Sequence, residues 1–171
     1  MLHRYSHTLL AVTLCASLLA CSTTTKQPDV HTPITTFGWD TPLPGTPDKI
    51  EITYKLPQKA HADILLFKRK VGHKGTALAR AQLSNDNCLR GHQAGMAYAT
   101  NEGAFYSQYF TQELSWNSHN TITIQWIGDN TLKVTVNNES LSVPITDRVR
   151  WLQILTYEAP IEIQQVKYIS K

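Results

Sequence analysis

One short stretch of this chain, Trp116-Asn117-Ser118-His119, combines four side chains that could contact a ligand. An indole can stack on a flat apolar surface such as a sugar ring, and the amide, hydroxyl and imidazole groups can orient a polar ligand by hydrogen bonds. The stretch is polar and lies between strand-like segments, which predicts a loop. We therefore take Trp116, Asn117 and His119 as candidate ligand-binding residues. The sequence leaves open the alternative that Trp116 is a packed structural side chain.

Motifs that would indicate an enzyme or a metal site are missing from the sequence. The carboxylates stand alone, rather than in the pairs that glycoside hydrolysis uses. There is no Gly-x-Ser-x-Gly elbow, P-loop or dinucleotide-binding fingerprint. No metal-ligand spacing connects the histidines of the folded part, which are His61, His73, His92 and His119. We expect a protein without enzymatic activity, metal or cofactor.

Covalent chemistry is predicted at Cys21. Arg4 precedes a mostly apolar run from Leu9 to Ala20, and about twelve residues are too few for a permanent membrane-spanning helix, which needs roughly 20. A positive start, a short apolar run and a small residue before the cut describe a secretory signal. The string Leu18-Leu19-Ala20-Cys21 resembles the lipobox of bacterial lipoproteins, in which the cysteine receives lipid, although Leu19 stands where a small residue is more common. A plain signal peptide and a membrane-anchoring helix are the alternatives.

The lipobox resemblance implies an arrangement in three parts. Residues 1–20 are the expected signal peptide, residues 21–36 the lipidated cysteine with a flexible linker, and residues 37–171 the folded domain. Pro28 and Pro33 and the absence of apolar periodicity support the linker. Several acyl chains on Cys21 would hold the protein stably on a membrane. Ser22 follows the cysteine, and in the Gram-negative lipoproteins that this sequence resembles, a residue other than Asp there accompanies sorting to the outer membrane.

The charge of the chain argues against nucleic-acid binding, and its cysteine content argues against a disulfide within the mature chain. The formal net charge is +3, too small for the clustered basic surface that nucleic-acid binding requires. Of the three cysteines, Cys15 leaves with the leader and Cys21 carries lipid, so Cys88 has no partner within the mature chain. We interpret it as a free thiol, with an intermolecular disulfide or a reactive thiol as alternatives.

Most ordered segments alternate apolar and polar residues with period two, which is typical of half-buried strands. The clearest segments are residues 50–56, 121–126, 132–137, 141–143, 151–157 and 161–168. A phase slip between Ile163 and Val166 predicts a β-bulge. The segment from Leu78 to Leu83 fits a strand or a short helix, and we expect Trp126 and Trp151 in the core. About ten short strands without a convincing helix predict an all-β antiparallel sandwich.

The final third of the chain resembles the closing part of a concanavalin A-like jelly roll, a fold shared by laminin-G, galectin and glucanase domains. The resemblance rests on four segments, which are His119–Trp126, Leu132–Asn137, Trp151–Ile154 and Ile161–Tyr168. The glucanase string Glu-x-Asp-x-(x)-Glu is absent, as are the galectin strings His-x-Asn-x-Arg and Trp-x-x-Glu-x-Arg. The resemblance therefore implies a fold and leaves the function open.

Three functions compete on these observations. The leading hypothesis is an outer-membrane lipoprotein whose β-sandwich is a non-enzymatic binding module for a glycan or an envelope protein. The second is a structural or assembly lipoprotein without a small ligand, which a large exposed apolar patch would favour. The third is a diverged glycan hydrolase, which two carboxylates converging on a cleft would favour.

Overall fold

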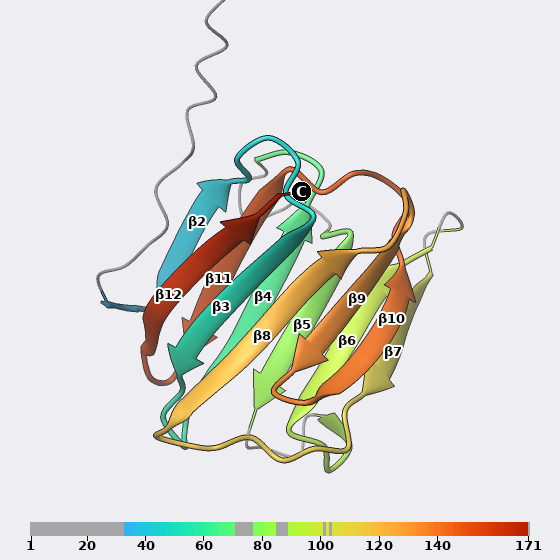
Figure 1. The fold of residues 1–171 in the computed structure, drawn as a ribbon. Helices are drawn as coiled ribbons and strands as arrows, with labels where there is room; N and C mark the ends of the chain where they lie inside the picture. The colour runs from blue at the N-terminus through green and yellow to red at the C-terminus, as the bar shows by residue number, and fades with distance from the viewer. Residues whose placement is uncertain (1–32, 71–76, 85–88, 101, 103, 171) are drawn as a thin grey trace, which may run out of the picture.

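Two antiparallel sheets packed face to face form the protein (Figure 1). The computed structural model describes residues 33–70, 77–84, 89–100, 102 and 104–170, and within them the chain forms twelve strands. No α-helix occurs in these ranges, which confirms the predicted all-β sandwich. The predicted signal peptide, Cys21 and Cys88 lie outside the described residues.

Sheet A contains most of the segments with the clearest period-two pattern. Its strands, in spatial order, are β1 (Ile34–Thr36), β12 (Ile161–Ile169), β3 (Lys49–Lys55), β8 (His119–Trp126), β9 (Thr131–Val136) and β10 (Glu139–Pro144). The pairing of β12 with β3 shifts between Ile163 and Gln165, which confirms the predicted bulge. At the β9–β10 hairpin Asn137 has a φ of 51°, a left-handed conformation that asparagine tolerates better than most residues.

Apart from β11, sheet B contains the segments that were harder to interpret. Its strands, in spatial order, are β2 (Gly38–Pro42), β11 (Trp151–Tyr157), β4 (His61–Phe67), β5 (Ala79–Ser84), β6 (Ala94–Ala99) and β7 (Phe105–Tyr109). The segment that fitted either a helix or a strand is β5, because β4 and β6 pair with it on both sides. Its small residues Ala79 and Ala81 face the core, each at most 2% exposed.

The core lies between the sheets and draws on both. Fully buried aliphatic side chains come from sheet A, such as Ile52 and Ile124, and from sheet B, such as Ile64 and Ile154. Tyr54 is also fully buried, and this burial raises the pKa of its phenol. The described residues thus share one continuous hydrophobic core, as expected of an independently folding domain.

Strand β1, just before the expected start of the domain at residue 37, already pairs with β12 of sheet A. The environment of Trp151 differs from the sequence-based expectation. Trp151 was expected in the core but points to the outer side of sheet B, where its Nε1 donates to Asp40 Oδ2 at 3.2 Å. The run Trp151–Tyr157 alternates, and Leu152 and Ile154 take the inward positions, so Trp151 must face outward.

Candidate functional site

The outer face of sheet B carries a cluster of charged side chains near its centre. Along β4, residues 62, 64 and 66 are buried in the core, so residues 61, 63 and 65 point to the opposite side. The register places Asp63 opposite Gln82 of β5, and Leu65 opposite Arg80. Asp63 is therefore a same-face neighbour of His61 on its own strand and a diagonal neighbour of Arg80.

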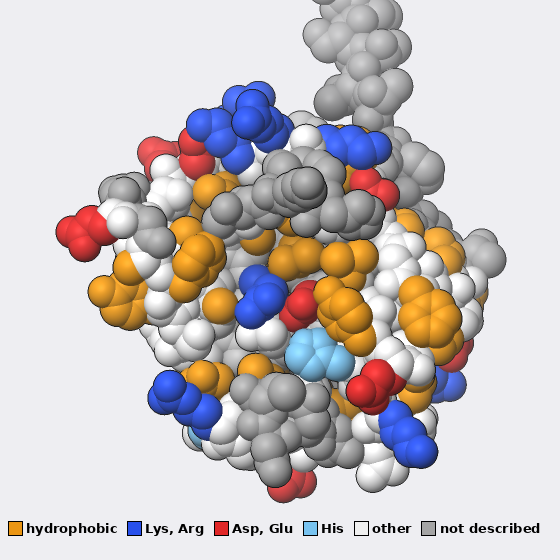
Figure 2. Space-filling model, turned by 180° about the vertical axis from the view of Figure 1, so that it is seen from behind, with side chains coloured by type: hydrophobic (Ala, Val, Ile, Leu, Met, Phe, Trp, Pro, Cys, Tyr) orange, Lys and Arg blue, Asp and Glu red, His pale blue; other side chains and the backbone are white. Residues whose placement is uncertain are grey.

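Distances confirm that these three side chains lie together. His61 Nε2 is 3.5 Å from Asp63 Oδ1, and Arg80 Nη1 is 3.8 Å from Asp63 Oδ2. Figure 2, which views this face, shows a basic, an acidic and a histidine side chain next to one another near the middle, with hydrophobic side chains around them. Charged groups of both signs are thus gathered at the centre of this face.

Asp63 is the unusual member of the cluster. It is 6% exposed, and its Oδ1 makes no hydrogen bond to any described residue. An ionised carboxylate has about four acceptor sites, and leaving them unused when buried costs free energy. Both contacts of Asp63 are longer than well-formed charge-assisted hydrogen bonds, which measure about 2.7–2.9 Å. The carboxylate is therefore incompletely paired, although its Oδ1 is closed off from solvent.

Aromatic and small residues border the cluster on its two sides. Tyr157 of β11 pairs with His61 across the strands, and the two rings meet edge to face with centroids 5.8 Å apart. Tyr157 is 49% exposed, so much of its ring is free for stacking. On the other side, β6 presents the small residues Gly95 and Ala97 outward. The face thus combines charged groups and an exposed ring with two small residues that are covered by their neighbours.

Gly95 lies in close contact with Tyr109, which leaves little room for a side chain. A Cβ added at Gly95 would lie 3.0 Å from Tyr109 Cδ1 and 3.3 Å from the carbonyl oxygen of Gln108. The Tyr109 ring crosses β6 at this point and stacks on His92, with centroids 5.0 Å apart and planes at 10°. His92 Nδ1 also contacts the carbonyl oxygen of Phe110 at 2.9 Å. This stack fills the β7 side of the face.

The candidate residues from the sequence lie elsewhere, in the loop between β7 and β8 at one end of the sandwich. Trp116 is half-buried, packs against the core and donates from Nε1 to Gln93 Oε1 at 3.2 Å. Asn117 has a φ of 56° and its backbone N–H donates to the carbonyl of Leu56. His119, at the start of β8, is exposed and pairs with Lys55.

The surroundings of these three residues differ in how well they fit the predicted ligand-binding role. The packing of Trp116 agrees with the structural alternative, whereas Asn117 lines a hollow of about 240 Å³ beside Lys55 and Glu162. The loop is organised by buried Asn120, whose Oδ1 accepts from Ser115 and whose Nδ2 donates back to the same residue. A binding role for Trp116, Asn117 and His119 stays a prediction.

Sequence reasoning did not identify the cluster on sheet B. A signal was present, because Asp63 directly precedes the apolar run Ile64–Phe67 in a strand expected to be central. A carboxylate in such a strand is rarely buried without a role. What the sequence lacked was the register, which brings Arg80 next to Asp63.

Metal and membrane-spanning features are absent from the described part of the chain. No group of three or more His, Cys, Asp or Glu side chains there is arranged to hold a metal ion. Within the same residues, no helix has the length and apolarity to cross a membrane.

The architecture has counterparts among proteins of known structure. No family model and no curated protein matches the sequence. Many solved structures match the fold, galectins among them. A tetrameric galectin from the ball sponge Cinachyrella sp. superimposes with a TM-score of 0.58 at 13% identity, covering 77% of this chain and 99% of its own. The chain has a galectin-like fold.

Two further galectins extend the comparison. A galectin from Caenorhabditis elegans gives a TM-score of 0.59 at 10% identity, covering 83% of this chain and 98% of its own. A toad ovary galectin, solved in complex with thio-digalactose, gives 0.57 at 11% identity, covering 77% and 98%. The galectin-like fold confirms the expected concanavalin A-like sandwich. At these identities the likeness establishes architecture, and function must be argued from the residues of this chain.

Proposed function

We propose that this protein is a lipid-anchored, non-enzymatic lectin of the bacterial cell envelope, and that it binds a glycan on the outer face of sheet B. The observation that carries the proposal is the cluster of His61, Asp63 and Arg80 beside the exposed ring of Tyr157 at the centre of this face. The Arg80 side chain is partly exposed and can donate to sugar oxygens, while Asp63 holds it in place. Tyr157 provides an exposed ring for the apolar side of a sugar.

The structural neighbours support this assignment at the level of fold. The galectins among them include one that was solved with thio-digalactose. The His-x-Asn-x-Arg and Trp-x-x-Glu-x-Arg strings are absent from this chain, so its glycan contacts must use other residues. The basic side chains that contact Asp63 within the described residues are those of His61 and Arg80. Glycoside hydrolysis uses a second carboxylate there, so this arrangement favours binding over a diverged hydrolase.

A glycan array probed with residues 22–171 tests the binding face. We expect selective binding by the wild type and loss of that binding in Asp63→Asn, which keeps the size of the side chain but removes its charge. Glu113→Gln is the matched control, because it removes an exposed carboxylate from a loop outside the cluster. A wild type that binds no glycan, or an Asp63→Asn protein that binds like the wild type, would refute the proposed face.

The anchor is the second part of the proposal. It rests on the lipobox string ending in Cys21, on residues 1–20 as signal peptide, and on the short chain between Cys21 and the start of β1 at Ile34. We place the protein at the outer membrane of a Gram-negative cell. Cys21→Ser should abolish labelling with palmitate and move the protein to the soluble fraction. Cys88→Ser should remain labelled and membrane-bound, and labelled Cys21→Ser protein would exclude lipidation at Cys21.

One observation favours a second function, assembly with an envelope protein. Strand β7 is one of the two edge strands of sheet B within the described residues, and its residues Phe105 and Tyr106 are 61% and 53% exposed. Exposed edge strands can pair with a strand of another chain. A photocrosslinker at position 105 should capture a defined envelope protein in cells if this function holds, while the glycan array stays blank.

A further inference from the structure

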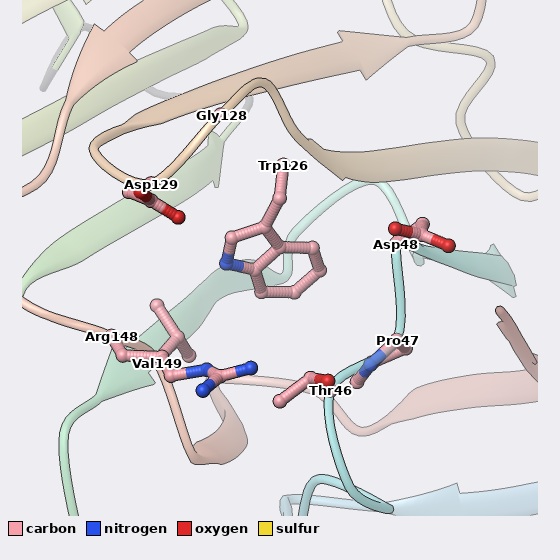
Figure 3. A pocket seen from close by; sticks show the side chains of 8 residues that line it. All are labelled: Thr46, Pro47, Asp48, Trp126, Gly128, Asp129, Arg148 and Val149. Carbon is pink, nitrogen blue, oxygen red and sulfur yellow. The ribbon is translucent and has the colours of Figure 1, made fainter. Parts of the chain in front are cut away.

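A pocket of about 310 Å³ opens at one end of the sandwich, away from the charged cluster of sheet B (Figure 3). Three connections form it: the loop between β2 and β3, the turn between β8 and β9, and the loop between β10 and β11. Trp126, which was expected in the core, is half-buried, and its indole extends into the pocket between Asp129 and Asp48, with Arg148 below it in the view of Figure 3. The pocket shares no lining residue with the His61–Asp63–Arg80 cluster.

Backbone hydrogen bonds fix the walls of this pocket. The N–H of Trp126 donates to the carbonyl of Asp48 at 3.0 Å, which joins the β8 end to the β2–β3 loop. The N–H of Ile145 donates to the carbonyl of Asn130 at 2.9 Å, which joins the β10–β11 loop to the β8–β9 turn. Val149 is 3% exposed and anchors the inner side of the pocket in the core. The pocket is thus largely pre-formed, a property of small-molecule sites.

The charged groups in the pocket are of opposite sign and available. Arg148 and Asp129 are exposed, and neither forms an ion pair with another described residue. Asp48 is a third charged residue of the lining, on the other side of the indole from Asp129 (Figure 3). A guanidinium donor and carboxylate acceptors therefore surround the indole. This combination suits an uncharged ligand that carries several hydroxyl groups, which can accept from the one and donate to the others.

We propose that this pocket is a second carbohydrate site, which binds a neutral hexopyranose. The apolar face of the sugar ring stacks on the indole of Trp126. Arg148 donates to hydroxyl oxygens of the sugar, and Asp129 accepts from a hydroxyl group. The volume lies at the lower end of the range for ligand pockets, roughly 300–1,000 Å³, which suits a single sugar ring rather than a long oligosaccharide. Binding at this pocket is independent of the proposed glycan face on sheet B.

Intrinsic tryptophan fluorescence tests the proposal, because the stacked residue is itself the reporter. The full chain is purified in a polyoxyethylene detergent, whose head group carries no sugar, and is titrated separately with D-glucose, D-galactose and D-mannose. We expect a saturable change with at least one hexose. The titration is repeated with the Asp63→Asn variant, in which the hexose-induced fluorescence change should persist. The pocket is thereby tested independently of the proposed glycan face on sheet B.

Three variants locate the signal. Arg148→Gln and Asp129→Asn should each weaken hexose binding about tenfold or more, because each removes a charged hydrogen-bonding partner. Arg150 is also exposed and belongs to the same loop but does not line the pocket, so Arg150→Gln should bind hexose with the affinity of the wild type. All three should melt like the wild type, since the changed side chains are exposed.

The proposal is overturned by any of three results. The first is that no hexose gives a saturable change. The second is that Arg148→Gln and Asp129→Asn bind as tightly as Arg150→Gln. The third is that a zwitterionic amino acid, tested as glycine and as leucine, saturates the pocket while the hexoses do not, because its ammonium and carboxylate groups would then be what Asp129 and Arg148 select.

Discussion

Glu139, the first residue of β10, holds Thr111 of the loop that follows β7. Its Oε2 accepts the backbone N–H of Thr111 at 2.7 Å, and its Oε1 accepts the Thr111 hydroxyl at 3.1 Å. The N–H of Gln112 donates to the same Oε2 at 2.8 Å. These bonds connect the edge of sheet A to the loop beyond the edge of sheet B, and they lower the pKa of Glu139, with the Gln112 backbone bond as the largest cause.

The lowered pKa gives a prediction about pH. Because the folded-state pKa of Glu139 lies below its ordinary value of 4.5, its contribution to stability is present above that value and is lost as the pH falls through the folded pKa. Glu139→Gln should therefore lower the melting temperature at neutral pH. The difference between wild type and variant should shrink in thermal melts taken at progressively lower pH. A difference that grows on acidification would contradict this linkage, and Glu113→Gln serves as control.

The exposed ring of Tyr157 gives a prediction about the proposed glycan face. Tyr157 is 49% exposed and touches His61 edge to face, so its truncation removes a stacking surface without opening the core. Tyr157→Ala should weaken glycan binding several-fold while changing the melting temperature little, and Tyr157→Phe should retain most of the affinity. Isothermal titration with a glycan identified on the array checks both. Equal affinity of Tyr157→Ala and wild type would remove Tyr157 from the site.

Trp116 separates the sequence-based site from the structural alternative. The sequence interpretation expects Trp116→Ala to weaken ligand binding while leaving stability nearly unchanged. The structure adds a packed indole with a hydrogen bond to Gln93, so we now expect the variant to lose stability. Truncating a well-packed Trp costs about 3–5 kcal/mol, and a half-buried one should cost less. Denaturant unfolding and binding measured on one sample decide between the two, and unchanged stability would return Trp116 to the candidate site.

The strands of sheet A were predictable because each buries one face only. In β3, β8 and β9 the buried and part-exposed positions alternate, as the residues at 50, 52, 122, 124, 132 and 134 show. Sheet B was harder to predict, because β4 and β6 contain runs of consecutive buried residues instead of a strict alternation. The alanines of β5 and the Gly95 and Ala97 of β6 are small for packing reasons that the sequence alone does not reveal.

The candidate face was not predictable from local sequence, because it is assembled by strand pairing. Asp63 and Arg80 lie on different strands with residues 71–76 between them, and only the β4–β5 register makes them neighbours. Sequence reasoning favoured a site made by one continuous loop, since such a site needs no register. The same reason explains why the pocket at Trp126 was missed, because its walls come from three separate connections.

Gly95 and Tyr109 provide a test of how the β6–β7 side of the face is built. Gly95→Ala places a methyl group 3.0 Å from Tyr109 Cδ1 and 3.3 Å from the carbonyl oxygen of Gln108. Since Tyr109 is also held by its stack on His92, the ring cannot move without losing that contact. Overpacking of this kind costs about 1–3 kcal/mol.

A double-mutant cycle distinguishes overpacking against the ring from a general effect of alanine at position 95. Urea unfolding should show that Gly95→Ala destabilises the wild-type protein. In a Tyr109→Ala background, where the ring is gone, the loss of unfolding free energy should be clearly smaller. Part of the cost should remain, because the Gln108 carbonyl belongs to the backbone of the neighbouring strand. If Gly95→Ala lowers the free energy of unfolding equally in both backgrounds, the Tyr109 ring is not the reason for glycine at position 95. The stack of Tyr109 on His92 would then not depend on that glycine.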